Sequence, residues 1–329
     1  MQEFSFRLLE EFRHATETRG RSVKPLLSMI AGLAEYEKKL GKSVLDFTTD
    51  NFIDFLSQYQ GTNRRSMRNQ KSYLNAYLDW LEQRGYPAAH AAEMLDPVTY
   101  DDLSLDHAFA KYYFRDFDSL KSHLSDRIEA ALEQGYIDPH VFDTQVVALY
   151  LAWFGLNKEE VLSLEKSALP ESGNRLDLPG KTLDLPGAVM ELLRAYAKAE
   201  GFERTKAKDG SYVEFCSYKA SKYLLRSIKS DCLSDNALRS SINTLNVADP
   251  EGKAFSFSKV YWSGVFSRIH SEELTGGRFE LPAYNRMNKG RAEFDRLKRI
   301  LADDAGNDDR VRDRMKEYEK YKAYFWPEG

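Results

Sequence analysis

Apolar residues recur every three or four positions along most of this chain, a spacing that places them on one face of a helix. One segment, residues 146–154, is instead apolar almost all the way round, as expected of a helix buried inside a domain. The predicted helices cover residues 4–18, 24–40, 51–58, 63–84, 88–95, 116–134, 142–154, 186–200, 234–245, 256–273, 289–303 and 308–325. The pattern therefore predicts a mainly α protein.

The apolar period changes to two at residues 176–185, where leucines alternate around Pro179 and Gly180. This spacing predicts a small β-hairpin with Lys181 near its tip. Residues 202–221 are charged and loop-like. Residues 223–228 fit either a helix or a short strand, because periodicity alone does not separate the two. The expected fold class is α with a small β-hairpin or sheet.

Residues 146–164 join the apolar helix to a turn and a second, amphipathic helix. Gly155 suits the point where the first helix must stop, because glycine readily takes the backbone conformation of a helix end. Glu159 and Glu160 fall in the first turn of the second helix, where their charge suits the positive end of the helix dipole. The pattern predicts a helix-turn-helix corner with Asn157 at its apex.

A change of character at residues 86–107 indicates a boundary between two domains. This stretch contains Pro87, Pro97 and scattered polar residues, and it separates a four-helix unit from a larger, mostly helical region. The chain of 329 residues is long enough for a substantial core on each side. We therefore predict two domains joined by a linker that contains one short helix.

The composition gives no global sign of a charged partner. There are 47 Lys and Arg residues against 51 Asp and Glu, so the formal net charge is −4, and nucleic acid would have to be held by local basic patches. Two cysteines outside any cluster and dispersed histidines argue against a disulfide framework and a metal site. The N-terminus lacks a signal-peptide core and no run reaches transmembrane length. We expect a cytoplasmic protein without cofactor or membrane partner.

Basic side chains recur at helical spacing in two places, on the helix at 63–84 and around the ambiguous segment at 223–228. Each set is either an ordinary solvated surface or a surface that contacts phosphates, and the sequence does not decide between them. The candidate DNA-contacting residues are Arg64, Arg65, Arg68, Lys71, Lys222 and Arg226.

The order of these elements resembles the tyrosine recombinase, or phage integrase, family. Residues 51–86 look like the paired helices of its core-binding domain, and FGLNKEEVLSL at 154–164 is similar to its Gly-Leu-Arg-x-x-Glu-Leu-x-x-Leu box. The resemblance implies a two-domain clamp around duplex DNA. It assigns residues 1–85 to a helical core-binding domain, 86–107 to a linker and 108–329 to a catalytic-like domain.

The resemblance also implies catalytic positions, and several of them differ here. Asn157 stands where the family has an arginine that grips the scissile phosphate, and a neutral amide cannot supply that permanent charge. The family's His-x-x-Arg box aligns with Lys259 and Trp262, with Arg268 further along the same helix. Lys181 matches the family's general-acid lysine. The family's later Gly-His element has no counterpart.

The nucleophile implied by the family lies in a cluster of three tyrosines near the C-terminus, Tyr318, Tyr321 and Tyr324. Tyr318 is the first choice by position. The alternative for all three is the apolar face of a docking C-terminal helix.

Three hypotheses follow from these observations. The leading one is a duplex-DNA-binding protein of integrase type, a pseudoenzyme from a phage or mobile element whose strand-exchange chemistry is lost or impaired. The second is an active recombinase with a divergent site made of Lys181, Lys259, Arg268 and Tyr318. The third is a protein-binding scaffold without DNA. The C-terminal helix is also a candidate contact with a second copy or another recombinase.

Overall fold

The computed structural model describes residues 7–8, 11–12, 14–15, 24–58, 63–134, 138–205, 213–279, 291–301 and 308–327. The chain forms two compact units, one of residues 1–109 with 312–329 and one of residues 110–311. Most of the helix predicted at 4–18 lies outside the described residues. The expected fold class is confirmed, since the described chain is mainly helical with two small antiparallel hairpins. The clamp and the boundaries at 85 and 107 stay predictions.

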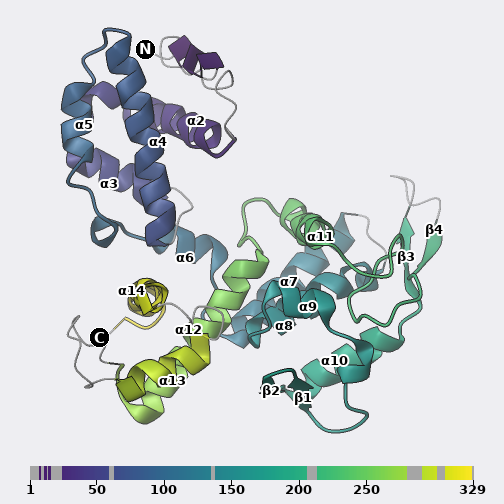
Figure 1. Cartoon of the computed structure of the whole chain (residues 1–329). Coiled ribbons are helices and arrows are strands. Elements are labelled where there is room, and N and C mark those ends of the chain that lie inside the picture. Colours follow the sequence, from purple (N-terminus) through teal and green to yellow (C-terminus); the bar gives the residue numbers. More distant parts are fainter. Residues whose placement is uncertain are drawn as a thin grey trace. The chain divides into compact units, whose positions relative to one another are not determined.

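The first unit is built on four helices, which Figure 1 shows as ribbons. Aromatic side chains fill the space between them. They are α2 (Lys24–Leu40), α3 (Thr49–Gln58), α4 (Arg64–Gln83) and α5 (Ala89–Leu95). The core centres on Phe47, whose ring lies 5.7 Å from that of Tyr36 and 5.3 Å from that of Phe52. Tyr36 also donates a 2.6 Å hydrogen bond from its hydroxyl to Asp54, which joins α2 to α3. Each amphipathic face predicted here is therefore buried against another.

Helix α4 begins and ends where its capping residues place it. Asn63 accepts a 2.9 Å hydrogen bond from the backbone N–H of Ser66, which satisfies one of the unpaired donors of the first turn. Gly85 has φ 86°, and the N–H of Tyr86 then donates to the carbonyl of Leu81. This is the closing bond of a glycine-terminated helix.

The segment predicted to be an inter-domain linker packs against the first unit. Val98, Tyr100, Leu103 and Leu105 are all buried, and the segment also contains α5 and the first half of α6 (Asp106–Tyr112). The prolines and scattered polar residues of this segment therefore correspond to short helices and turns whose apolar side chains are buried. The short helix expected at 88–95 is confirmed as α5.

Helix α14 (Asp308–Phe325) returns to the first unit over most of its length and contacts the turn at 101–103. Lys316 places its ammonium 2.7 Å from the carboxylate of Asp101, and Lys320 donates a 2.7 Å hydrogen bond to the carbonyl of Leu103. Tyr321 is fully buried, and its ring meets that of Phe109 edge-on at 5.7 Å. The tyrosine face of this helix is therefore part of a core.

The second unit surrounds helix α8 (Asp143–Trp153), as its all-round apolar pattern predicts (Figure 1). Its helical neighbours are α9 (Lys158–Ser163), α10 (Gly187–Lys198), α11 (Asp235–Ala248) and α12 (Phe257–Gly276). At the crossing of α8 and α12, a Cβ on Gly264 would lie 1.9 Å from the carbonyl oxygen of Trp153. Only glycine allows this approach. Helices α7 (Phe117–Glu133) and α13 (Arg291–Leu301) complete the unit.

Two antiparallel hairpins lie at the edge of the second unit. The predicted one is present as β1 (Arg175–Leu178) and β2 (Lys181–Asp184), with Leu176 opposite Leu183. A second pairs β3 (Gly201–Thr205) with β4 (Val213–Ser217). The expectation of a loop over 202–221 was wrong there, because charged residues such as Glu203, Arg204 and Glu214 mask the strand alternation. Residues 223–228 form only an isolated bridge from Tyr223 to Glu165.

Because α14 packs through one of its tyrosines, we expect alanine substitutions at two neighbouring tyrosines to lower the free energy of unfolding by different amounts. Tyr321→Ala should lower the free energy of unfolding by about 3–5 kcal/mol, because it empties a buried aromatic site. Tyr324→Ala, whose side chain is 36% exposed, is the matched control and should cost clearly less. Urea denaturation followed by circular dichroism measures both. Equal, small effects would show that α14 does not dock through Tyr321.

Candidate functional site

The candidate site centres on the corner between α8 and α9, where the family resemblance places its phosphate-gripping arginine. Gly155 has φ 95°, and a Cβ at this position would lie 2.8 Å from the guanidinium of Arg268. The N–H of Leu156 donates to the carbonyl of Leu151, which closes the end of α8. The backbone conformation therefore favours glycine at this turn, and a larger residue would also displace the guanidinium of Arg268.

Asn157 caps helix α9 and does not point a charge into the corner. Its side-chain oxygen accepts a 3.0 Å hydrogen bond from the N–H of Glu160, and Glu160 accepts a 2.7 Å hydrogen bond from the N–H of Asn157. This reciprocal pair is a capping box, which satisfies two otherwise unpaired donors. An arginine here would lose the side-chain acceptor, so the local fold favours the amide.

Two of the predicted catalytic cations meet at the same corner. Lys181, at the start of β2, donates to the carbonyl of Gly155 at 2.9 Å and to the carboxylate of Glu160 at 2.6 Å. Arg268, from α12, donates to the carbonyl of Trp153 at 2.6 Å. Burial lowers the pKa of Arg268 to about 10, so it remains charged at neutral pH. Both cations lie at the negative end of the α8 dipole, where positive charge is stabilising.

The other predicted catalytic residues have different surroundings. Lys259 lies with its ammonium 5.0 Å from the centroid of the Tyr113 ring and 3.2 Å from the tyrosine hydroxyl. Trp262 packs against the rings of Tyr261 and Phe266. Tyr318 belongs to the other unit, where its side chain is fully buried. The structure therefore brings Asn157, Lys181 and Arg268 together, while Tyr318 has no exposed surface.

The predicted DNA-contacting residues of α4 divide into two kinds. Arg64, Arg65 and Arg68 are exposed, and Arg64 has an ion pair with Asp313 at 3.6 Å. Arg65 and Arg68 make no hydrogen bond or ion pair with any residue that the structure describes. Lys71 instead donates to the carbonyls of Asp96 and Val98, so it fastens the end of α5. The exposed basic surface of α4 is therefore made by its arginines.

Arg226 has a different place from the one predicted for a DNA contact. It is only 7% exposed and donates to the carbonyls of Tyr196, Ala197 and Ala199 at the C-terminal end of α10. Its guanidinium also lies 4.8 Å from the centroid of the Tyr218 ring. In this structure Arg226 is a buried helix cap and offers no surface to a ligand.

Lys222, the neighbouring candidate, remains at the surface. Its side chain is 64% exposed and forms an ion pair with Glu165 at 2.5 Å. Hydrogen bonding to Glu165 raises the pKa of Lys222, so the lysine is charged at neutral pH. Its contribution to a phosphate contact stays a prediction.

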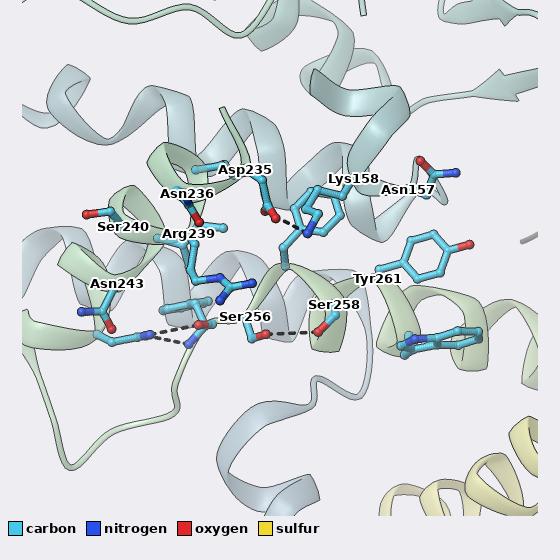
Figure 2. Close-up of a pocket in the computed structure, with 16 residues that line it drawn as sticks. Asn157, Lys158, Asp235, Asn236, Arg239, Ser240, Asn243, Ser256, Ser258 and Tyr261 are labelled. Carbon is cyan, nitrogen blue, oxygen red and sulfur yellow. Dashed lines mark hydrogen bonds and ion pairs between the residues drawn. The ribbon is translucent and has the colours of Figure 1, made fainter. Parts of the chain in front are cut away.

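A pocket of about 690 Å³ lies between the start of α9, helix α11 and the first turns of α12 (Figure 2). Asn157 and Trp262, the two positions where the family has arginines, both line it. On its upper side in Figure 2, Lys158 and Asp235 form a 2.8 Å ion pair that joins α9 to α11. The two departures from the family pattern therefore share one cavity.

Sequence reasoning missed the α11 side of this pocket. Asn236, Arg239 and Asn243 recur at spacings of three and four residues, so they share one helical face, and all three are exposed. The signal was present in the sequence, because Leu238, Ile242 and Leu245 form the complementary buried stripe.

No group of three or more His, Cys, Asp or Glu residues within the described ranges is placed to hold a metal ion. Among the helices that the structure describes, none has both the length and the apolar character needed to cross a membrane.

Comparison with known proteins supports the resemblance at the N-terminal end. Residues 10–83 match the family model described as the N-terminal core-binding domain of MrpR. The chain resembles the tyrosine recombinases. The matched core-binding domain takes in α2, α3 and α4 and ends at Gln83, the last residue of α4. The exposed arginines of α4 therefore lie within the core-binding domain.

Two solved structures are similar over most of the chain, at low identity. A lambda integrase dimer bound to a COC′ core site is 12% identical, with a TM-score of 0.36, covering 98% of this chain and 97% of the other. XerA recombinase is 13% identical, with a TM-score of 0.32, covering 91% of this chain and 98% of the other. No curated protein matches the chain.

The capping role of Asn157 predicts a stability effect that a purely exposed amide would not have. Asn157→Ala should lower the free energy of unfolding by about 0.5–2 kcal/mol, while Asn157→Asp should retain most of the cap. Asn243→Ala removes an exposed amide of the same pocket and should change stability by no more than about 0.5 kcal/mol. Urea denaturation compares the three variants. The capping account fails if Asn157→Ala and Asn243→Ala are indistinguishable.

Proposed function

We propose that this protein binds duplex DNA with a tyrosine recombinase-like architecture and does not perform strand exchange. The observation that carries the proposal is the set of contacts that the side chains make at the corner formed by residues 153–160. The residue in place of the phosphate-gripping arginine caps a helix, and the two cations beside it bind carbonyl groups and a carboxylate. The core-binding match at residues 10–83 supports DNA as the partner.

The exposed arginines of α4 supply the chemistry for contacting DNA. Arg65 and Arg68 are three residues apart, so they project from neighbouring positions on one face of the helix. A guanidinium matches the geometry of a phosphate and contacts it with two parallel hydrogen bonds. Several such contacts hold a protein on the DNA backbone without reading its sequence.

The loss of strand exchange follows from what phosphoryl transfer requires. Its transition state is stabilised by cations aimed in advance at the developing charge on the phosphoryl oxygens. Lys181 and Arg268 would have to leave Glu160 and the α8 carbonyls to serve in this way, and Asn157 brings no charge. An active enzyme using Lys181, Lys259, Arg268 and Tyr318 would in addition need Tyr318 to leave a fully buried position.

A protein that binds DNA without cutting it acts as a regulator, an accessory factor or a competitor at recombination sites. We propose this role, with a cytoplasmic location and an origin in a phage or mobile element. The apolar face of α14, which the sequence suggested as a contact with another recombinase, packs on Phe109 of the same chain. DNA is therefore the partner that the structure supports best, ahead of a protein-binding scaffold.

Paired substitutions on two helices of the first unit test the proposal. Replacing Arg65 and Arg68 together by alanine should weaken duplex binding and reduce the slope of log affinity against log salt by about 2, since two phosphate contacts are lost. Replacing Lys38 and Lys39 of α2 removes the same charge from exposed positions outside α4 and should change the slope little. Fluorescence anisotropy with a labelled duplex at several salt concentrations measures both. Duplex binding that does not depend on salt, or equal loss in both variants, would refute the role of α4.

A further inference from the structure

The pocket between α9, α11 and α12 has the size of a small-molecule site. Its volume of about 690 Å³ falls inside the range of about 300–1,000 Å³ that is usual for ligand pockets. A nucleotide fits a space of this size. The chemistry of the walls decides which class of ligand the pocket suits.

The wall formed by α11 presents polar groups that the protein itself leaves available. Asn236, Arg239, Ser240 and Asn243 are exposed, and their side chains form no hydrogen bond or ion pair with any part of the chain that the structure describes. Asn246, the next residue of the stripe, differs because its amide is held by the backbone of Phe255 through bonds of 2.9 and 2.7 Å. The pocket therefore offers two amides, a hydroxyl and a guanidinium to a ligand.

The facing wall formed by α12 is aromatic. Phe257, Tyr261 and Trp262 line the pocket. Tyr261 and Trp262 meet edge-on, with ring centroids 5.3 Å apart and planes at 86°. Aromatic rings bind nucleobases by stacking, whatever the base.

Two cations and one carboxylate line the pocket, and Arg239 is the cation without an ion pair among the residues that the structure describes, although Asp235 lies near enough to interact with it. Lys158, the other cation of the lining, already forms an ion pair with Asp235 on the upper side of the pocket in Figure 2. Arg239 projects from α11 toward Ser256, at the start of α12 (Figure 2). The N-cap residue Ser256 makes no side-chain bond to the backbone of that helix, and the N–H of Lys259 in the first turn donates to the carbonyl of Ser256 at 3.0 Å.

We propose that this pocket binds a nucleotide, with the base against the aromatic wall and the amides, and the phosphate at Arg239. Asparagine amides form paired hydrogen bonds with the edge of adenine, which makes an adenine nucleotide the first probe. The ligand is either a free nucleotide or an unpaired nucleotide of a DNA strand. The inference goes beyond duplex binding, because it needs only the second unit and not the arginines of α4.

Calorimetry on the full chain tests the proposal with three small probes: adenosine monophosphate, ribose 5-phosphate and inorganic phosphate. Adenosine monophosphate should bind, and ribose 5-phosphate should bind at least about tenfold more weakly, because it lacks the stacking base. A second pair of probes is a duplex with one unpaired adenine and the same duplex fully paired. Preference for the unpaired adenine without binding of the free nucleotide would identify the DNA strand as the source.

Three variants assign the binding to the pocket. Arg239→Ala and Asn243→Ala change exposed side chains and should each weaken binding of the adenine probe about tenfold. Lys229→Ala is the matched control, because it removes an exposed positive charge of the same unit outside the pocket lining, and it should have no effect.

The proposal is overturned if neither adenine probe binds, or if ribose 5-phosphate or inorganic phosphate binds as tightly as adenosine monophosphate. It is also overturned if both pocket variants behave like Lys229→Ala. Binding of the fully paired duplex through Arg65 and Arg68 is a separate measurement, so the loss of one function is distinguishable from the loss of the other.

Discussion

The second unit depends on supplying hydrogen-bond partners to the carbonyl groups at the C-terminal ends of its helices. The last turn of every helix leaves these acceptors unpaired and carries partial negative charge, and a buried polar group without a partner costs about 1–3 kcal/mol. Four helices of this unit meet the constraint with basic side chains from distant elements. Arg268 and Lys181 serve α8, Arg226 serves α10, Arg127 serves α11 and Arg296 serves α12.

Because these basic side chains bind carbonyl groups of the protein, they are not available to contact a ligand in this structure. Lys181 and Arg268 hold the corner between α8 and α9 in place, so the charges of this corner face carbonyl groups of the protein itself. Exposed cations lie elsewhere, among them Arg65 and Arg68 of α4 and Arg239 beside the aromatic pocket. Contacts with nucleic acid are compatible with that distribution. This distribution is the basis of our proposal that the protein binds DNA without strand exchange.

Local pattern was enough to predict most of the helices and not enough to predict the partners of single side chains. The helix expected at 24–40 is α2 at the same residues, and the leucine alternation gave the β1–β2 hairpin. Arg226 looked like a surface cation because it recurs at helical spacing with other basic residues, yet the carbonyls it binds are 27–30 residues away. The spacing of the tyrosines in α14 predicted that they share one face of a helix, but it did not predict which element packs against that face. Such contacts are non-local, so periodicity carries no information about them.

The most direct test of the central claim is a search for a covalent intermediate. An active recombinase of this type joins a tyrosine to DNA, so incubation with a library of nicked duplexes, followed by denaturing electrophoresis, would reveal a protein–DNA adduct. We predict that the protein shifts duplex DNA under native conditions and forms no adduct under denaturing ones. An adduct that disappears in Tyr318→Phe and in Lys181→Met would contradict the account, because it would show that the buried tyrosine and the carbonyl-bound lysine are both released for catalysis.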